Sequence, residues 1–314
     1  MKIAITGVSG FIGGQAALHF HREGHEVLGI DLRPCSENIS SACYKFVQAD
    51  FGSPDCLEIL LDYLPDAILH FAASSLVAPS MLDPEQYYQN NVVQTKNLLD
   101  VWAKHLRTTR LIFASSSSIY GEPHQVPCSE TQLPNPISPY AESKLMGEFM
   151  IKSYARAYNL PAVIFRYFNV CGADISSKHG QEPGATHIIA RLLESIRDDK
   201  IFRLNGIDYS TPDGTCVRDH IHVQDVANLC EFACDANFKP GLYNVGLGRG
   251  KSNMQIINLA KDVANKDPEI EIGPSRDGDP SELFADVSRL KATGWFPKFN
   301  LNQMIIHAWK WYTR

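Results

Sequence analysis

The segment KIAITGVSGFIG, residues 2–13, starts as an apolar run of strand length and continues through three glycines into a helix-favouring stretch that reaches Arg22. This order predicts a β-strand, a tight glycine turn and an α-helix at the start of the chain. A second apolar run, residues 27–30, ends at Asp31. The opening residues therefore predict a β-α-β unit with a glycine-rich first turn.

The three glycines of this turn, Gly7, Gly10 and Gly13, have a physical use at this spacing. They let the backbone turn sharply and approach a pyrophosphate, whose charge is stabilised by the N-terminus of the following helix. The Asp31 carboxylate can accept hydrogen bonds from an adenosine ribose and would repel a 2′-phosphate, which favours NAD over NADP. The nearby Arg33 weakens that preference. The structural alternative is a glycine turn that only packs a helix on a sheet.

The same alternation of strand and helix continues through the first half of the chain. Further apolar runs of strand length lie at 46–47, 67–71, 111–114 and 162–165. Helical stretches lie at about 55–63, 84–106 and 139–159, and others follow near 185–198, 225–235 and 252–265. This pattern predicts an α/β fold with a doubly wound parallel sheet of Rossmann type. After Arg166 the alternation loosens, which predicts a smaller mixed α/β lobe that binds substrate.

We therefore expect two domains. Residues 1–168 form the NAD-binding domain and residues 169–314 the lobe, with a segment of about 215–236 returning to the first domain. Asp225 is expected to cap the helix that follows it.

Composition excludes several classes of protein. The 314 residues carry a net charge of −6, which offers no basic surface for nucleic acid. No apolar run reaches the roughly 20 residues that span a bilayer, and the N-terminus lacks a signal-peptide pattern, so we expect a cytosolic protein. The 8 cysteines form no CxxC pair and are expected to be free thiols. The histidines show no spacing typical of a metal site.

A candidate acid–base pair lies in the segment SPYAESK, residues 138–144. Tyr140 and Lys144 are four residues apart, which puts both on one face of a helix that starts at Pro139. A neighbouring ammonium and a nicotinamide would lower the pKa of the phenol and make it a better base. The cluster of serines at 115–118, at the end of a predicted strand, supplies a hydroxyl partner. A surface pair without function is the alternative.

These motifs together resemble the extended short-chain dehydrogenases/reductases. The segment RYFNVCG at 166–172 resembles the RYFN-x-x-G segment of nucleotide-sugar 4-epimerases. The segment DYSTPDGTCVRDHIHVQDVA at 208–227 is similar to the signature of the UDP-glucose (UDP-galactose) 4-epimerases. The resemblance extends over nearly the whole chain.

The resemblance implies a role for individual residues. Ser116, Tyr140 and Lys144 are the implied catalytic residues, and Ser118 is the neighbouring hydroxyl. The implied cofactor-binding residues are Gly7, Gly10, Phe11, Ile12, Gly13, Asp31, Asp50, Phe71, Ala72, Ala73, Asn91, Tyr140, Lys144 and Tyr167. The implied substrate-binding residues are Ser116, Ser118, Asn169, His187, Arg218, Arg276 and Leu283. For the amides and arginines the alternatives are a satisfied buried amide and a surface ion pair.

Some positions depart from the family pattern. Ser75 lies where some members have lysine, His187 where asparagine is frequent, and His220 where tyrosine is usual. Leu283 lies where residue size selects the sugar, because a bulky side chain excludes an N-acetyl group.

The resemblance implies an isomerase with tightly bound NAD that interconverts UDP-glucose and UDP-galactose through a 4-keto intermediate. A dehydratase is disfavoured because Ser117-Ser118 replaces its Asp-Glu pair, and a decarboxylase because its glutamate is absent. One alternative is an epimerase of UDP-N-acetylglucosamine and UDP-N-acetylgalactosamine. A remote alternative is a catalytically silent NAD-binding scaffold. Relatives pair the two long helices of the first domain between subunits, which implies a homodimer.

Overall fold

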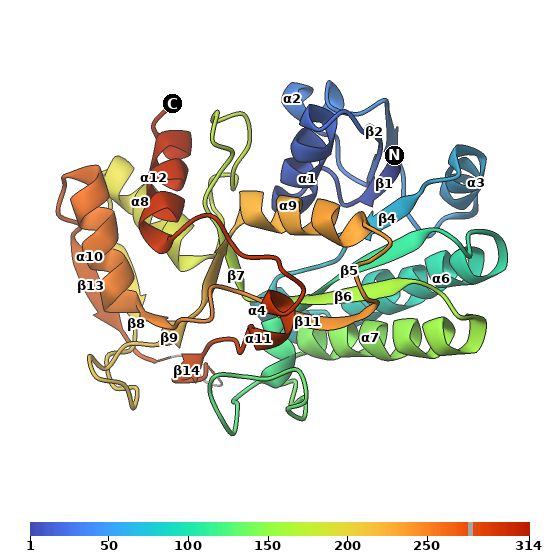
Figure 1. Cartoon of the computed structure of the whole chain (residues 1–314). Helices are drawn as coiled ribbons and strands as arrows, with labels where there is room; N and C mark the ends of the chain where they lie inside the picture. Colours follow the sequence, from blue (N-terminus) through green and yellow to red (C-terminus); the bar gives the residue numbers. More distant parts are fainter. Residues whose placement is uncertain (276–278) are drawn as a thin grey trace. The chain divides into compact units, whose positions relative to one another are not determined.

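The computed structural model describes residues 1–275 and 279–314 (Figure 1). The chain folds into two compact units. Unit 1 contains Met1–Ile119, Pro136–Arg166 and Ala227–Tyr243, and unit 2 contains Tyr120–Asn135, Tyr167–Val226 and Asn244–Arg314.

The described residues of the first unit are built on a seven-stranded sheet with the order β11-β6-β5-β4-β1-β2-β3. The strands are β1 (Lys2–Thr6), β2 (Glu26–Asp31), β3 (Lys45–Gln48), β4 (Ala67–His70), β5 (Arg110–Ser116), β6 (Ala162–Tyr167) and β11 (Gly241–Val245). β1 pairs in parallel with β2 and β4, β2 with β3, and β4 with β5. The central strands are buried along nearly their whole length, because parallel strands are covered on both faces.

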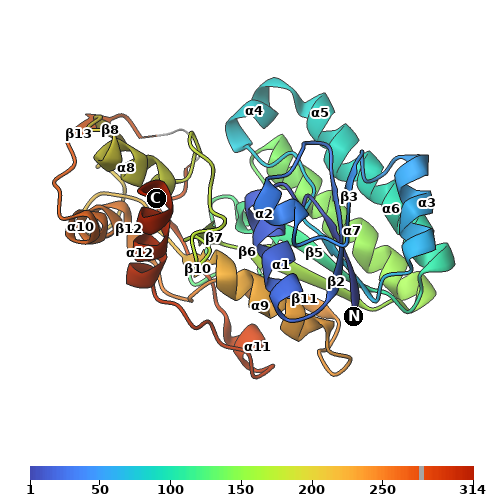
Figure 2. The same ribbon diagram turned by 90° about the horizontal axis from the view of Figure 1, so that it is seen from above.

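Helices cover both faces of this sheet, as Figure 2 shows for α1 on one side and α6 and α7 on the other. Their bounds are α1 (Phe11–Arg22), α2 (Glu37–Ser40), α3 (Pro54–Tyr63), α4 (Val77–Leu82), α5 (Pro84–Tyr88), α6 (Gln94–His105), α7 (Pro139–Tyr158) and α9 (Val223–Cys234). A π-helical turn, Gln89–Val93, joins α5 to α6, and a 3-10 turn, Ser117–Tyr120, follows β5. The single helix expected over 84–106 is therefore divided into α5, the π turn and α6.

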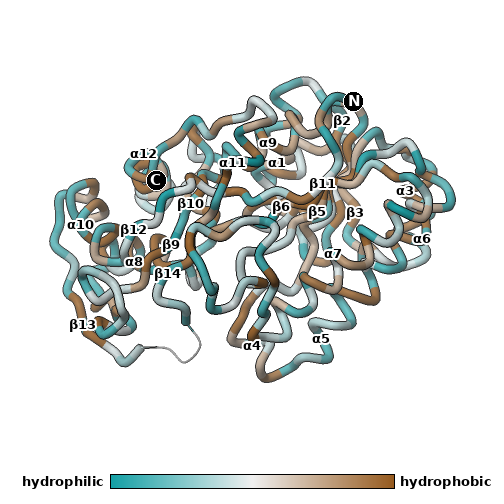
Figure 3. The backbone as a smooth tube through the Cα atoms, turned by 60° about the horizontal axis from the view of Figure 1, so that its bottom comes forward, coloured by the Kyte–Doolittle hydropathy of each residue, from teal (hydrophilic) through white to brown (hydrophobic). Residues whose placement is uncertain are grey.

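One hydrophobic core of unit 1 lies between the sheet and the helices α3, α6 and α7. Trp102 and Phe113 are among its largest members, and Trp102 donates its indole N–H to the Thr109 carbonyl at 2.8 Å. Figure 3 shows hydrophobic residues gathered along the strands β5, β6 and β11. Continuous apolar runs therefore form the centre of this unit.

Unit 2 is made of short strand pairs and helices. β7 (Asn169–Cys171) pairs in parallel with β10 (His220–His222). The remaining strands are β8 (Phe202–Asn205), β9 (Val217–Arg218), β12 (Lys251–Ser252), β13 (Ile270–Gly273) and β14 (Glu282–Leu283). The helices are α8 (Ile188–Arg197), α10 (Asn253–Ala264), α11 (Ser288–Lys291) and α12 (Leu301–Tyr312). Apolar side chains of α8, α10 and α12 form one buried cluster, which is the core of this unit.

The predicted doubly wound parallel sheet is confirmed, and its order 3-2-1-4-5-6 is that of a Rossmann fold extended by β11. The helix α12 and the short strands of unit 2 were not expected from the sequence. The predicted domains differ from the compact units at three places. Residues 120–135 and 167–168 group with unit 2, and the segment that returns to unit 1 is 227–243.

The cap expected at Asp225 is wrong, because this residue lies within α9. Its buried carboxylate instead accepts hydrogen bonds from the backbone N–H groups of Lys298 and Phe299, at 2.9 and 3.1 Å. All eight cysteines are free thiols, as expected. Within residues 1–275 and 279–314, no helix has the length and apolar character needed to cross a membrane.

Candidate functional site

Residues singled out in the sequence meet along one edge of the unit 1 sheet. Asp31 ends β2, Gly7 follows β1, residues 71–73 follow β4, and Ser116 ends β5. These four strands are neighbours in the order β2-β1-β4-β5, so their carboxyl ends form one continuous edge. The strand order reverses at β1 and β4, which is where open α/β sheets bind ligands.

The glycine turn at this edge leaves no room for side chains. Gly7 has a positive φ of 76°, and a Cβ atom on it would lie 2.6 Å from the Ala72 nitrogen. A Cβ atom on Gly13 would lie 2.1 Å from the Gly7 carbonyl oxygen. Gly10 is the N-cap of α1 and gives it no side-chain cap, so the N–H groups of Phe11 and Ile12 begin an uncapped helix. An anion can therefore approach this helix end closely.

Two predicted cofactor-binding carboxylates, Asp31 and Asp50, lie at the carboxyl ends of β2 and β3. Asp31 accepts hydrogen bonds from the backbone N–H groups of Ser9 and Arg33, both at 2.9 Å. The Arg33 side chain is 69% exposed and lies 3.7 Å from Asp31, so it points largely to solvent. Asp50 accepts from the Gly52 backbone N–H and, at 2.7 Å, from the Gln94 side-chain amide.

Tyr140 and Lys144 lie in the first turns of α7. This helix starts where it does because Pro139 occupies its first position and the Ser138 side chain accepts a hydrogen bond from the Ala141 N–H. The helix packs against β5, which ends at Ser116. The predicted catalytic residues therefore lie in one unit, on two elements that contact each other.

Ser116 and Ser118 form a directed pair of hydroxyls. The Ser116 Oγ accepts a hydrogen bond from the Ser118 Oγ at 2.9 Å and from the Ser118 backbone N–H at 3.2 Å. Because both bonds end on the Ser116 oxygen, its own proton is available to donate. The phenol of Tyr140 interacts with this hydroxyl.

Lys144 is buried, and its ammonium lies 4.8 Å from the centre of the Phe113 ring. In the described part of the chain this ammonium has no hydrogen-bond acceptor. Burial lowers the pKa of Lys144 to about 8, although the charge of Glu148 opposes this. The site therefore contains a cation at neutral pH whose hydrogen-bonding capacity is unused.

The protein's own groups raise the pKa of Tyr140. Burial raises the pKa of Tyr140, and the negative charge that Tyr87 would carry also raises it, while the interaction with Ser116 lowers it. The Lys144 ammonium is directed to the face of Phe113 rather than to the phenol. Burial therefore outweighs the other effects of the protein's own groups on Tyr140, and the lowering expected from the ammonium together with the nicotinamide stays a prediction.

A buried ion pair behind the site was not expected from the sequence. Arg166 donates from Nε and Nη2 to the two carboxylate oxygens of Glu148, each at 2.8 Å. Ser115 donates to the same carboxylate at 2.7 Å. Ser115 precedes Ser116, and Glu148 lies one helical turn after Lys144, so this network ties together the elements that carry both residues. Its partners are far apart in sequence, so no short sequence motif could predict this network.

Asn91 and Tyr167, two of the predicted cofactor-binding residues, are both buried. The Asn91 side-chain amide donates to the Ser74 carbonyl and to the Ser143 hydroxyl, both at 2.9 Å. Its oxygen accepts from the Ser74 N–H at 2.8 Å. Asn91 therefore uses both amide hydrogens within the protein. Tyr167 is the last residue of β6.

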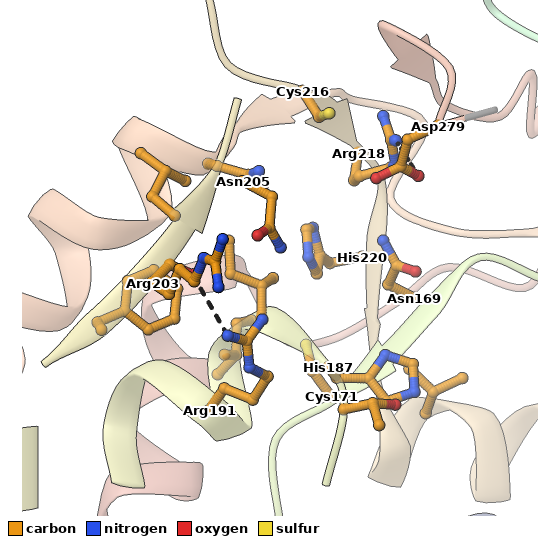
Figure 4. A pocket seen from close by; sticks show the side chains of 17 residues that line it. Asn169, Cys171, His187, Arg191, Arg203, Asn205, Cys216, Arg218, His220 and Asp279 are labelled. Carbon is orange, nitrogen blue, oxygen red and sulfur yellow. Dashed lines mark hydrogen bonds and ion pairs between the residues drawn. The ribbon is translucent and has the colours of Figure 1, made fainter. Parts of the chain in front are cut away.

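Unit 2 has its own cavity, of about 170 Å³, which we call the unit 2 pocket. It is lined by residues of β7, β8, β9 and β10 and of the start of α8, and Figure 4 shows their side chains around it. Three predicted substrate residues, Asn169, His187 and Arg218, line this pocket. His187 is accessible to solvent at its edge, yet the surrounding protein atoms lower the pKa of its imidazole.

Arg218 is already paired within this pocket. It donates to the Val217 carbonyl at 2.9 Å and forms an ion pair with Asp279 at 3.1 Å. Leu283 lies in β14, paired with Arg218 across the strands, but it is buried and is not part of the pocket lining. Arg276, also predicted to bind substrate, lies outside the described residues. Among the residues described, no three His, Cys, Asp or Glu side chains are grouped to hold a metal ion.

Comparisons with known proteins agree with this arrangement. The sequence profile of the NAD dependent epimerase/dehydratase family matches residues 3–246. The chain is 34% identical to a UDP-glucose 4-epimerase from Halalkalibacterium halodurans over 320 residues, covering 99% of this chain and 96% of that protein.

Two solved structures are also similar over nearly the whole chain. The first is UDP-glucose 4-epimerase from Stenotrophomonas maltophila with bound NAD and formylated UDP-arabinopyranose. Its TM-score is 0.93 at 31% identity, with 100% of this chain and 98% of that chain covered. The second is the UDP-Glc/GlcNAc 4-epimerase from Campylobacter jejuni, with a TM-score of 0.85 at 34% identity and 99% of each chain covered.

Proposed function

This chain belongs to the NAD-dependent epimerase/dehydratase family, and on that premise we propose that it is an NAD-dependent 4-epimerase of UDP-glucose and UDP-galactose. The observation that carries the proposal is the grouping of Ser116, Tyr140 and Lys144 on two contacting elements of unit 1, at the sheet edge that also carries the glycine turn. The family membership supplies the reaction class, and these side chains supply the chemistry.

The residues at the sheet edge fit NAD. The glycine turn, where a Cβ atom would collide with backbone, gives the pyrophosphate close access to the uncapped start of α1. Asp31 would accept hydrogen bonds from the adenosine ribose, and Lys144, whose ammonium lacks an acceptor, would bind the nicotinamide ribose. NAD, when bound, supplies the acceptor for the hydride from C4 of the sugar and returns it.

The protein side chains handle the proton and the oxygen at C4. Tyr140 removes the proton of the 4-hydroxyl, and Ser116 donates its free proton in a hydrogen bond to the 4-oxygen. Ser118 supports this by donating to Ser116, which fixes the direction of the serine hydroxyl. Lys144 lies one helical turn after Tyr140 on α7, and its positive charge would favour the phenolate as the proton leaves. The 4-keto sugar then accepts the hydride on its other face, and Tyr140 returns the proton.

The unit 2 pocket is our candidate site for the UDP part of the substrate. Its lining includes three arginines, Arg191, Arg203 and Arg218, and one carboxylate, that of Asp279. The positive charges therefore outnumber the negative one. Guanidinium groups bind phosphate oxygens in a bidentate manner. The unpaired side-chain amide of Asn169 adds a donor and an acceptor within the described part of the pocket.

The candidate substrates differ in the group at C2 of the sugar, which is a hydroxyl in the plain sugars and an N-acetyl group in the others. We favour the plain sugars, because leucine at 283 is larger than the small residues that admit an N-acetyl group. The relative from Campylobacter jejuni is described as acting on both UDP-Glc and UDP-GlcNAc. The decisive assay compares UDP-galactose with UDP-N-acetylgalactosamine on one preparation of protein. A preference for the acetylated sugar would replace our first choice with the second.

We also propose a homodimer, supported by apolar side chains on the outer surface of unit 1. Phe149 and Met146 on α7 are 58% and 41% exposed, and Val93 in the π turn is 43% exposed. Exposed apolar side chains on neighbouring helices are typical of an interface between subunits. Sedimentation across micromolar concentrations tests this, and a monomer throughout that range would refute it. The cytosolic location stays a prediction.

The direct test of the function uses protein as purified. We expect it to release NAD on denaturation and to convert UDP-galactose to UDP-glucose without added cofactor, because the hydride leaves and returns within one turnover. Protein that carries NAD but converts no UDP-sugar would instead support the silent scaffold. Protein that is active without NAD, bound or added, would refute the mechanism.

A further inference from the structure

His220 is the buried polar side chain of the unit 2 pocket that lacks a partner. It is 1% exposed and lines the pocket from β10. Neither of its ring nitrogens has a hydrogen-bond partner among the described residues. Figure 4 shows the ring directed into the pocket, between Asn205 and Asn169.

Hydrogen bonds hold the backbone of His220 in place. The His220 N–H donates to the Asp219 carboxylate at 2.8 Å, and the strand pairs in register with Asn169 of β7. Asp219 is itself fixed, because it accepts further N–H groups from Leu247, Gly248 and Ala285. The strand that carries His220 is therefore held in place, and buried polar side chains are rarely left without a partner. The pocket is therefore prepared for a ligand that bonds to the imidazole.

The groups around the ring favour an uncharged imidazole. The titratable and charged groups that line the pocket with it are Cys171, His187, Arg191, Arg203, Cys216, Arg218 and Asp279. Asp219 precedes His220 in the chain. Burial, together with the charges of His187 and Arg218, lowers the pKa of His220 to about 3. The Arg218 carbonyl raises the pKa a little, but its contact with the ring does not reach hydrogen-bond geometry.

Resting on the proposed function, we propose that His220 is a specificity-determining residue that hydrogen-bonds to the nucleoside diphosphate part of the substrate. The arginines of the pocket carry the charge complementarity to the phosphates. The imidazole contributes one direct hydrogen bond and does so as a neutral group. The strand that carries it is held by its own backbone hydrogen bonds. Binding of the nucleotide therefore satisfies a polar group that is unsatisfied in the free protein.

The test is calorimetric titration of the purified protein with UDP. His220→Phe keeps an aromatic ring of similar size but removes both nitrogens, and we expect it to weaken UDP binding roughly tenfold or more. His220→Gln restores a donor and an acceptor and should stay within about threefold of wild type. His222→Phe is the matched control on the same strand: His222 is hydrogen-bonded to His307 and does not line the pocket, so UDP affinity should not change.

Proton uptake separates a neutral imidazole from a cation. Titrations at pH 7 in two buffers of different ionisation enthalpy should give the same proton uptake for wild type and His220→Gln. One additional proton taken up by wild type would overturn the neutral role, and UDP affinity unchanged in His220→Phe would overturn the proposal. If His220→Phe does not fold, His220→Ala takes its place, and free imidazole should restore its UDP affinity. Absence of rescue would overturn the proposal, whereas wild type that does not bind UDP would instead refute the proposed function.

Discussion

The ion pair behind the site, Glu148 with Arg166, allows a stability prediction from the contacts. Their side chains are 0% and 2% exposed, and three hydrogen bonds of 2.7 to 2.8 Å end on the carboxylate from Ser115 and Arg166. Glu148→Gln keeps the size of the side chain but leaves the guanidinium charge buried without its counter-charge. Removing one partner of a buried pair typically costs about 3–5 kcal/mol. We expect about 3 kcal/mol here, because the amide oxygen still accepts one hydrogen bond.

The assay is urea unfolding, with Lys152→Ala as the matched control. Lys152 binds the same carboxylate at 3.1 Å, but its side chain is 44% exposed, so its loss should cost about 0.5 kcal/mol. At a slope of about 3 kcal/mol per molar urea, the Glu148→Gln midpoint should fall by about 1 M and the control by much less. A Glu148→Gln midpoint no lower than that of the control would refute the reasoning.

The sign of the pH dependence follows from the same pair. Burial alone would raise the pKa of Glu148, but Arg166, Ser115 and Lys152 lower it overall. A group with a lowered pKa stabilises the fold above its unfolded pKa of about 4.3 and loses that contribution as the pH falls through its folded pKa. The difference between wild type and Glu148→Gln should therefore be full at pH 7 and shrink in acid. A difference that grows on acidification would contradict the assignment.

Further predictions concern the site itself. Tyr140→Phe should cut turnover by about 100-fold or more while UDP affinity is kept; a variant that retains most of its rate would remove Tyr140 from the mechanism. Turnover should decline as the pH rises through about 8, where Lys144 loses its proton, and a rate that stays constant well above that pH would show that the charge is not needed. Gly13→Ala should lose bound NAD, because its Cβ would meet backbone, whereas Gly24→Ala, with no atom within 4 Å of its Cβ, should keep it; equal NAD contents would contradict the cofactor assignment. Leu283→Ser should raise, and Leu283→Tyr lower, activity on UDP-N-acetylglucosamine relative to UDP-glucose, and an unchanged ratio in both would place this residue away from the sugar.

The sequence alone determined the elements whose signals are local. A strand, a glycine turn and a helix follow one another within residues 2–22, and each is set by neighbouring residues. The start of α7 is equally local, because Pro139 and the Ser138 cap fix it and thereby put Tyr140 and Lys144 on one face. The order of strands and helices was enough to predict the doubly wound sheet.

Only the tertiary structure decided what surrounds these side chains. Glu148 on α7 meets Ser115 on β5 and Arg166 on the neighbouring strand β6. These three residues come together only when the helix packs on the sheet, so no short stretch of sequence shows the pairing. The same holds for Asp225, whose partners Lys298 and Phe299 lie on a distant segment, and for His220, whose unsatisfied ring could not be read from its motif. Burial and charge act through space, and they set hydrogen-bond partners and pKa values only once distant segments of the chain have packed together.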